Sequence, residues 1–209
     1  AAAAVNNALL YQKELQRSIE LAGLANLAQS VTALQEPQEL YSRLIANITP
    51  LLNVEILGFL IYDETRRVLE GQEPFQGLQS NVIEWCRTTI QPDSPAEALW
   101  READPIVVVN APEDPRIQAL ELHHLARAAG IREMVLMPLS SAGRSLGYLQ
   151  AANKRDETPF DSNDLRILSI IAGQVAPIID NARLALQSRR RAQSAETLRW
   201  RRSATRRRS

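Results

Sequence analysis

The chain has 209 residues, of which 45% are hydrophobic, and its formal net charge is zero. A chain of this length builds one hydrophobic core or at most two small ones. Cys86 is the only cysteine, which excludes an internal disulfide and a cysteine-rich metal site and favours a reducing cytoplasm. No apolar run approaches the roughly 20 residues of a membrane span, and no secretory signal pattern opens the chain.

The zero net charge hides an uneven distribution of charge. From Arg183 onward the chain has ten arginines and one acidic residue, Glu196, so the residues before Arg183 are acidic overall. Such a basic end is typical of contact with nucleic acid or anionic lipid, or of a solvated end cut from a longer chain. Three Trp, four Tyr and three Phe do not supply an aromatic surface for stacking bases. The composition therefore disfavours nucleic acid as a partner.

Hydrophobic periodicity, turn residues and prolines divide the chain into helices and strands. In chain order we expect helices at residues 5–31 and 37–52, a strand at 54–64, a turn and shorter strand within 65–77, helices at 80–90 and 94–104, a strand at 105–110, a helix at 117–130, strands at 131–141 and 145–154, and a helix at 162–191. The turn Ala142-Gly143-Arg144 joins the last two strands as a hairpin, and Pro177 lies inside the final helix.

This order of elements predicts an α+β fold. A hairpin near each end and the lack of a strand-helix-strand rhythm favour an antiparallel sheet of five or six strands with segregated helices. The final helix carries an apolar stripe of Leu168, Ile171, Val175, Ile179, Ala182 and Leu186. We therefore expect the long first and last helices to pack side by side on one sheet face.

The stretch NKRDETPFDSNDL, residues 153–165, is a well-formed helix start. Asp161 is placed as the N-cap, and Asp164 falls at the third helical position, as in a capping box. Phe160 and Leu165 have the spacing of a hydrophobic staple. The final helix is therefore predicted to begin directly after Asp161.

Two stretches resemble a known family. LAGLANLAQSVTALQEPQELYSRLIANITPLLNVEILGFLIYDE resembles the opening of a GAF domain, the sensor module of phosphodiesterases, phytochromes and bacterial signalling proteins. IREMVLMPLSSAGRSLGYLQAANKRDETPFDSNDLRILSIIAGQVAPIIDNARL is similar to its closing half. The resemblance covers residues 21–184 and implies a profilin- and PAS-related sheet fold. It divides the chain into a linker helix at 1–20, a GAF domain at 21–186 and a basic helix or tail at 187–209.

The GAF domains of cyclic-nucleotide phosphodiesterases carry an Asn-Lys…Phe…Asp-Glu signature. Asn153, Lys154, Phe160 and Asp164 match it in order, and Leu165 stands where the family has Glu. The resemblance implies that Lys154 and Asp164 pair and clamp the last strand to the final helix. The signature alone does not make the chain a cyclic-nucleotide receptor.

The resemblance also implies a pocket between one sheet face and the segment at 78–130. The candidate lining residues are Phe59, Ile61, Trp85, Val107, Asn110, Met134 and Leu136. The polar residues best placed to orient a ligand are Arg87, Asn110 and Arg116. The candidates mix strand parities because the sequence does not say which face is the pocket face, and each residue also fits a plain core role.

No catalytic or metal site is evident. His123 and His124 are adjacent, so on a helix they diverge by about 100° and do not suit one metal ion. Bilin-binding GAF domains place a Cys-His pair where this chain has Glu121 and Leu122, so no covalent bilin is expected. Haem bound through one histidine stays open, and the cofactor is otherwise unknown. The chain has no nucleophile elbow, phosphate loop or zinc-protease motif, so we expect no enzyme activity.

Two functions follow from the resemblance. One is a cytoplasmic regulatory sensor that binds a small molecule non-covalently, and the other is a ligand-free dimerisation or spacer module. The pattern Asn-Ala-x-Leu occurs at residues 7–10 and again at 181–184, which predicts a preceding sensor domain and a continuous helix. Such a helix favours a parallel homodimer with a histidine kinase or nucleotide cyclase as the output domain.

Overall fold

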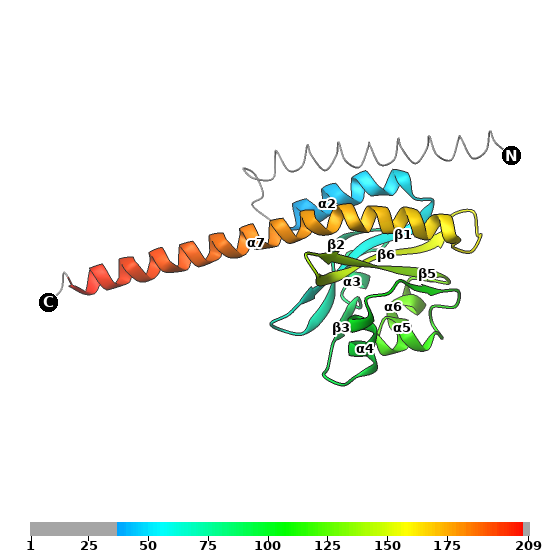
Figure 1. Cartoon of the computed structure of the whole chain (residues 1–209), viewed down its shortest axis with the longest axis horizontal. Helices are drawn as coiled ribbons and strands as arrows, with labels where there is room; N and C mark the ends of the chain where they lie inside the picture. The colour runs from blue at the N-terminus through cyan, green and yellow to red at the C-terminus, as the bar shows by residue number, and fades with distance from the viewer. Residues whose placement is uncertain (1–36, 207–209) are drawn as a thin grey trace.

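The computed structural model describes the backbone of residues 37–206 and the side chains of residues 38–189 (Figure 1). An antiparallel sheet in the order β3-β2-β1-β6-β5-β4 forms its centre, which confirms the predicted fold class. The strands are β1 (Val54–Asp63), β2 (Val68–Gln76), β3 (Arg87–Thr89), β4 (Ile106–Val108), β5 (Met134–Ser141) and β6 (Arg144–Lys154). The helices are α2 (Pro37–Ile48), α3 (Ser80–Ile83), α4 (Pro95–Glu102), α5 (Pro115–Ala119), α6 (His123–Ala128) and α7 (Ser162–Arg206).

Helices cover both faces of the sheet, and each face has its own core (Figure 1). We call the face covered by α2 and α7 the helix face, and the face covered by α3, α4, α5 and α6 the opposite face. Along β1, Leu57, Phe59 and Ile61 belong to the helix-face core, whereas Ile56 and Leu60 belong to the opposite-face core. This two-sided burial explains why β1 is an almost unbroken apolar run.

The final helix α7 packs on the helix face and then leaves the domain. Five residues of the predicted stripe are buried, Leu168, Ile171, Val175, Ile179 and Ala182, and the sixth, Leu186, is half-buried. The helix runs through Pro177 and continues to Arg206, well past the predicted end near residue 191 (Figure 1). The helix that packs beside α7 is α2, the second predicted helix, and the packing predicted for the first and last helices stays a prediction. The predicted helix at 5–31, including the Asn-Ala-x-Leu pattern at 7–10, lies outside the described residues.

The segment Ser162–Arg189 of α7 has the length and apolar content of a membrane-crossing helix. The side chains that make it apolar are the stripe that packs against the sheet. Burial against the sheet accounts for part of this composition, since 44% of the most apolar window is buried.

The structure corrects two predicted helices between β2 and β5. The predicted helix at 80–90 ends at Ile83, and residues 87–89 form β3, in which Thr89 pairs with Val68 of β2. Two β-branched threonines favour a strand here, and the buried Thr88 hydroxyl donates to the Leu120 carbonyl. The predicted helix at 117–130 is two helices, because Glu121 has a left-handed φ of 54° that ends the first one.

The hairpin between β5 and β6 turns on two residues rather than three. Ala142 and Gly143 have φ values of 49° and 74°, and Arg144 already belongs to β6. Two successive positive φ values characterise the two-residue turn that matches the twist of antiparallel strands. Arg144 is thereby placed beside α7, where its Nη2 donates to both carboxylate oxygens of the buried Asp180 at 2.9 Å.

Candidate functional site

The opposite face of the central strands is where two of the predicted pocket residues lie. Met134 and Leu136 of β5 are both fully buried there, in the same core as Leu60 and Tyr148. Side chains from α3, α4, α5 and α6 complete this core. Met134 and Leu136 therefore contact other core residues on the face where the sequence analysis expected a pocket.

Three further predicted lining residues point the other way. Phe59, Ile61 and Val107 pack in the helix-face core, so they do not line the opposite face. The Phe59 ring lies 5.7 Å from the Tyr41 ring of α2, centroid to centroid. Alternate residues of a strand face opposite sides of the sheet, so the predicted lining residues divide between the two faces.

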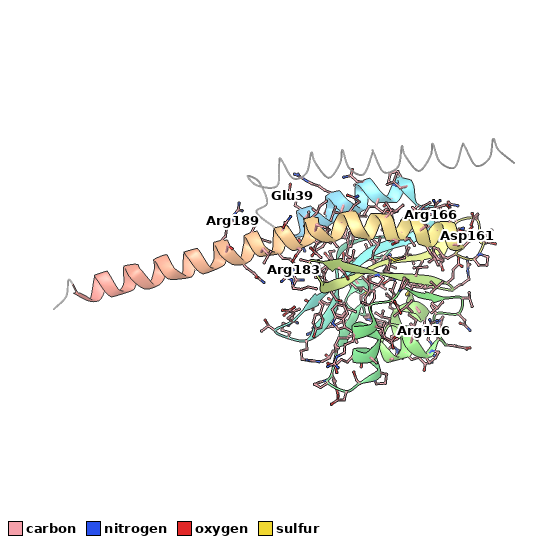
Figure 2. The ribbon with its side chains drawn as sticks, in the orientation of Figure 1. Glu39, Arg116, Asp161, Arg166, Arg183 and Arg189 are labelled. Atoms are coloured by element: carbon pink, nitrogen blue, oxygen red, sulfur yellow. The ribbon has the colours of Figure 1, made fainter. Side chains whose placement is uncertain are left out.

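The polar candidates lie at the surface in two places: Asn110 and Arg116 are at the β4–α5 connection, where both bond Asp114, and Arg87 is in β3. Arg116 is half exposed and donates to Asp114 and to the Val107 carbonyl, and these bonds hold the end of β4 against α5 (Figure 2). The Asn110 side chain donates to Glu113. Arg87 is exposed in β3, and 51% of Trp85, two residues before it in the chain, is exposed. The structure does not bring these residues together into one site.

Gln150 is the exceptional residue of the opposite face. It is fully buried in β6 between Tyr148 and Ala152, which both belong to the opposite-face core. Neither its side-chain nitrogen nor its side-chain oxygen has a hydrogen-bond partner among the described residues. A buried amide without partners is costly, about 1–3 kcal/mol relative to a satisfied one, so each such group in a protein calls for an explanation.

The backbone around Gln150 is built to let side chains lie close to the sheet. Its neighbours across the strands are Gly58 of β1 and Leu136 of β5. A Cβ at Gly58 would lie 2.0 Å from the Phe75 ring, so Phe75 occupies the space directly over Gly58. Only glycine allows this approach, which places an aromatic ring beside the strand position of Gln150.

Other polar groups also reach the opposite-face core. The Tyr148 hydroxyl donates to the Leu99 carbonyl at 3.4 Å, and burial raises its pKa to about 12. The Nδ1 atom of His123 is buried without a partner among the described residues. Burial, and then the neighbouring His124, lower the pKa of His123. These groups make the opposite face less uniformly apolar than its packing alone would indicate.

The described residues contain no group of three or more His, Cys, Asp or Glu side chains arranged to hold a metal ion. Cys86 is 1% exposed, and burial raises the pKa of its thiol to about 12. A thiol with this pKa is protonated at neutral pH and is a poor nucleophile.

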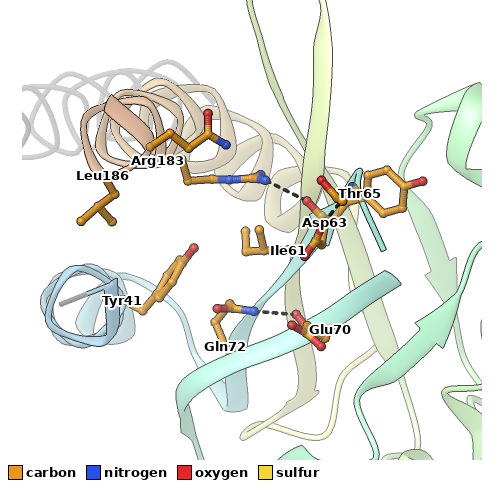
Figure 3. Close-up of a pocket in the computed structure, with 10 residues that line it drawn as sticks. Tyr41, Ile61, Asp63, Thr65, Glu70, Gln72, Arg183 and Leu186 are labelled. Atoms are coloured by element: carbon orange, nitrogen blue, oxygen red, sulfur yellow. Dashed lines mark hydrogen bonds between the residues drawn. The ribbon is translucent and has the colours of Figure 1, made fainter. Parts of the chain in front are cut away.

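A second candidate site is an open pocket of about 490 Å³ on the helix face, where α7 leaves the domain (Figure 3). Its wall comes from α2, from the β1–β2 hairpin and from α7. The lining residues are Tyr41, Ile61, Tyr62, Asp63, Thr65, Glu70, Gln72, Arg183, Leu186 and Gln187. Ile61 is thus the one predicted ligand-binding residue that lines it.

Arg183 and Tyr41 face each other across this pocket (Figure 3). Arg183 Nη2 donates to the Tyr62 carbonyl at 3.0 Å, and no carboxylate of the described chain lies within ion-pair distance of its guanidinium. Burial raises the pKa of the Tyr41 hydroxyl to about 12, against the smaller opposing effect of the Arg183 charge. The pocket therefore contains a cation and a protonated hydroxyl as available donors.

The signature residues lie where β6 meets α7. Lys154 Nζ donates to Asp164 Oδ2 at 2.8 Å, and that oxygen also accepts from the Asp161 amide. Asp161 Oδ1 accepts from the amides of Asn163 and Asp164, which completes the capping box. Phe160 packs against the helix-face core.

Asn153 ties this junction to the rest of the sheet. It is buried, with a left-handed φ of 53°. Its side chain donates to Glu55 and to the Gly130 carbonyl and accepts from the Arg132 amide. Asn153 thereby links β6 to Glu55 of β1 and to the loop that contains Gly130 and Arg132.

Sequence reasoning missed Gln150, Tyr41 and Arg183. A signal for Gln150 was present, because it is the only polar side chain in the apolar run LGYLQAA and shares the strand parity of Tyr148. No signal joins Tyr41 to Arg183, since they are far apart in the sequence and meet only through the packing of α2 and α7.

Three solved structures illustrate the fold of the chain. A domain of a protein described as a two-component sensor histidine kinase, from Sinorhizobium meliloti, has a TM-score of 0.56 at 20% identity and covers 74% of this chain and 99% of its own. The GAF domain of a phosphoenolpyruvate-protein phosphotransferase from Coxiella burnetii has a TM-score of 0.57 at 15% identity, covering 81% and 97%. Free methionine-R-sulfoxide reductase from Neisseria meningitidis, solved with its substrate, has a TM-score of 0.56 at 21% identity, covering 86% and 93%.

These identities are low, so the structural matches establish the fold alone. No curated protein matches the sequence. The family model of the GAF domain matches residues 35–180, which is more than half of the chain and includes the whole sheet. The chain therefore belongs to the GAF domain family.

Proposed function

We propose that the chain is a non-catalytic, cytoplasmic sensor module of a signal-transduction protein. It binds a small molecule non-covalently and passes the signal through dimeric terminal helices to an output domain such as a histidine kinase or nucleotide cyclase. GAF domains with this fold occur in proteins described as a sensor kinase and a phosphotransferase, which supports a regulatory role.

The observation that carries this proposal is the course of α7. The helix has 45 residues, about 67 Å at 1.5 Å per residue. Its first half is fixed to the sheet by its buried stripe and by the Arg144–Asp180 ion pair, and its second half extends away from the domain (Figure 1). A change in how the sheet holds the first half would move the second half as one rigid element.

The ligand site that we propose for this function lies on the opposite face, at Gln150. A small molecule with hydrogen-bonding groups would satisfy the amide, which has no partner among the described residues. Met134 and Leu136 would then be the predicted residues that contact it, beside Gly58 and Phe75. The apolar surroundings with one central polar group match the usual make-up of a small-molecule site.

A second candidate function is a ligand-free dimerisation or spacer module. The observation that favours it is the filling of the opposite face by Leu60, Phe75, Met134 and Leu136, which are all buried. On this account Gln150 is a residual polar group of a packed core. Its replacement by an apolar residue would then have no consequence for binding.

An enzymatic function needs separate consideration because one structural neighbour is a methionine sulfoxide reductase. Reduction of a sulfoxide by cysteine requires a reactive thiolate. Cys86 is the only cysteine of the chain, and its burial and raised pKa oppose thiolate formation. We therefore propose regulation rather than catalysis for this chain.

The experiment compares small molecules retained by the purified wild-type chain and by Gln150→Met. Each protein is denatured and the released molecules are identified by mass spectrometry. The sensor proposal expects a molecule stoichiometric with the wild-type chain and absent from the variant, while the exposed control Gln118→Met retains it. Equal retention by Gln150→Met would contradict the proposed site, and a loss in the control would show that the effect is unspecific.

A further inference from the structure

The pocket beside α7 is distinct from the site at Gln150. It lies on the helix face, whereas Gln150 lies on the opposite face, so the sheet separates them. Three parts of the fold meet in it: Tyr41 of α2, Gln72 of β2 and Arg183 of α7 (Figure 3). A molecule held here would contact α7 directly at the point where the helix leaves the domain.

The charges around the pocket balance. One wall carries Arg183, and the other carries the carboxylates of Asp63 and Glu70. Arg66 lies behind those two acids, with its Nη1 3.1 Å from Glu70 Oε1 and 3.9 Å from Asp63 Oδ2. Two cations and two anions give no net charge, so the pocket favours a ligand without net charge over a polyanion such as a nucleotide.

The two walls nevertheless differ in what they can bind. The Arg183 guanidinium uses one Nη for the Tyr62 carbonyl and has further N–H donors, and the Tyr41 hydroxyl has no hydrogen-bond partner among the described residues. Both are donors suited to a carboxylate. Opposite them, the carboxylate of Glu70 and the side-chain oxygen of Gln72 are acceptors, because Gln72 uses its nitrogen for the Glu70 carbonyl.

We propose that this pocket binds a small zwitterion of the amino-acid class, with its carboxylate on Arg183 and Tyr41 and its ammonium group toward Asp63 and Glu70. Ile61 and Leu186 supply the apolar contact for the side chain of the ligand. The volume of about 490 Å³ is ample for such a molecule. Bound there, the ligand would bridge α2, β2 and α7 and hold the exit of α7 in one position.

The binding claim stands by itself, and only its consequence for α7 depends on the proposed signalling function. The test is isothermal titration of the purified chain with each standard L-amino acid, with a simple amine, a simple carboxylate and inorganic phosphate as comparison ligands. We expect one or a few amino acids to bind at millimolar concentration or below. The amine, the carboxylate and phosphate alone should bind at least about tenfold more weakly, because each lacks one pole of the zwitterion.

Two conservative variants locate the binding. Tyr41→Phe keeps the ring against Phe59 and removes only the hydroxyl, and Arg183→Gln removes the charge but can still donate to the Tyr62 carbonyl. Each should weaken amino-acid binding by about tenfold or more. Arg166→Gln is the matched control, because Arg166 lies on α7 at the other end of its buried segment and bonds Asn163 (Figure 2).

The outcomes separate this inference from the proposed function. Absence of binding by every amino acid, or equal binding of phosphate, would overturn the inference. Loss of binding in Gln150→Met with normal binding in Arg183→Gln would also overturn it, since the ligand would then sit on the opposite face. Binding lost in Tyr41→Phe and Arg183→Gln but kept in Gln150→Met would support it, even if α7 were later found not to signal. Circular dichroism of each variant confirms that the fold is retained.

Discussion

Lys154 and Asp164 join the last strand of the sheet to the first turn of α7 through a hydrogen bond of 2.8 Å. Only 10% of the Lys154 side chain is exposed, and the bond to Asp164 raises its pKa. The same carboxylate oxygen closes the capping box by accepting from the Asp161 amide. One carboxylate thus fixes both the end of β6 and the start of α7, the helix that we propose as the output element.

We predict that Lys154→Met lowers the free energy of unfolding by about 1–3 kcal/mol, the range for a largely buried hydrogen bond to a charged group. The loss occurs because Asp164 keeps its charge but loses the ammonium partner. Urea denaturation of Lys154→Met, Asp164→Asn and the double variant measures the coupling of the pair. Additive effects of the two single substitutions would show that the bond does not contribute to stability.

Acid should weaken the start of α7. The hydrogen bond from the Asp164 amide, followed by that from Asn163, lowers the pKa of Asp161 below its ordinary value of 3.8. Its contribution to stability is therefore present above pH 3.8 and disappears as the pH falls through the lower pKa of the folded state. Asp161→Asn should lower the thermal midpoint relative to wild type at pH 7 and have a smaller effect at pH 3. An equal effect at both pH values would contradict this reading.

Much of the fold could be predicted from the sequence, because the local sequence patterns and the burial of apolar side chains favour the same helices and strands. The apolar run of β1, the capping box at Asp161 and the stripe of α7 each specify one local structure, and the protein contains all three. The incorrect predictions lie where tertiary contacts, rather than local signals, determine the secondary structure. Thr88 forms a strand because it can pair with β2 and donate to Leu120, and Glu121 breaks a helical pattern because the chain turns there to bury Leu120 and Leu122.

The candidate site was less predictable than the fold. Met134 and Leu136 were placed on the expected face, but Phe59 points to the other side, because a single strand supplies residues to both cores. The pocket between Tyr41 and Arg183 depends on how two distant helices pack. No spacing within the sequence encodes that proximity.

Cys86 should be unreactive in the folded protein. Its thiol is buried and its pKa is raised to about 12, so at pH 8 the thiolate is scarce and inaccessible. We expect a thiol reagent such as dithiobis(nitrobenzoate) to label the native chain slowly and the urea-unfolded chain at once. Cys86→Ser should leave amino-acid binding unchanged. Rapid labelling of the native chain, or turnover of methionine sulfoxide that Cys86→Ser abolishes, would instead favour an enzyme.

The proposed homodimer predicts an oligomeric state that depends on the terminal helices. Leu184 is 43% exposed on α7, where a second copy would cover it. Light scattering at tens of micromolar should give a dimer, and Leu184→Glu should raise the dimer dissociation constant by about tenfold or more. Gln118→Glu, which adds the same charge at an exposed position of α5 away from the terminal helix, is the control. A strict monomer, unchanged when residues 1–20 are removed, would contradict the dimer.

The premise of the proposed ligand site, an unsatisfied amide at Gln150, is tested most directly by the stability of Gln150→Met after small molecules are removed by unfolding and refolding. If Gln150 bonds a ligand, its amide has no hydrogen-bond partner in the ligand-free protein. Methionine is of similar size and removes the free-energy cost of burying that amide. We predict that urea denaturation shows the variant more stable than wild type by about 1–3 kcal/mol, with Gln118→Met unchanged. A variant less stable than wild type would mean that the fold itself satisfies Gln150, and it would contradict the ligand site on the opposite face.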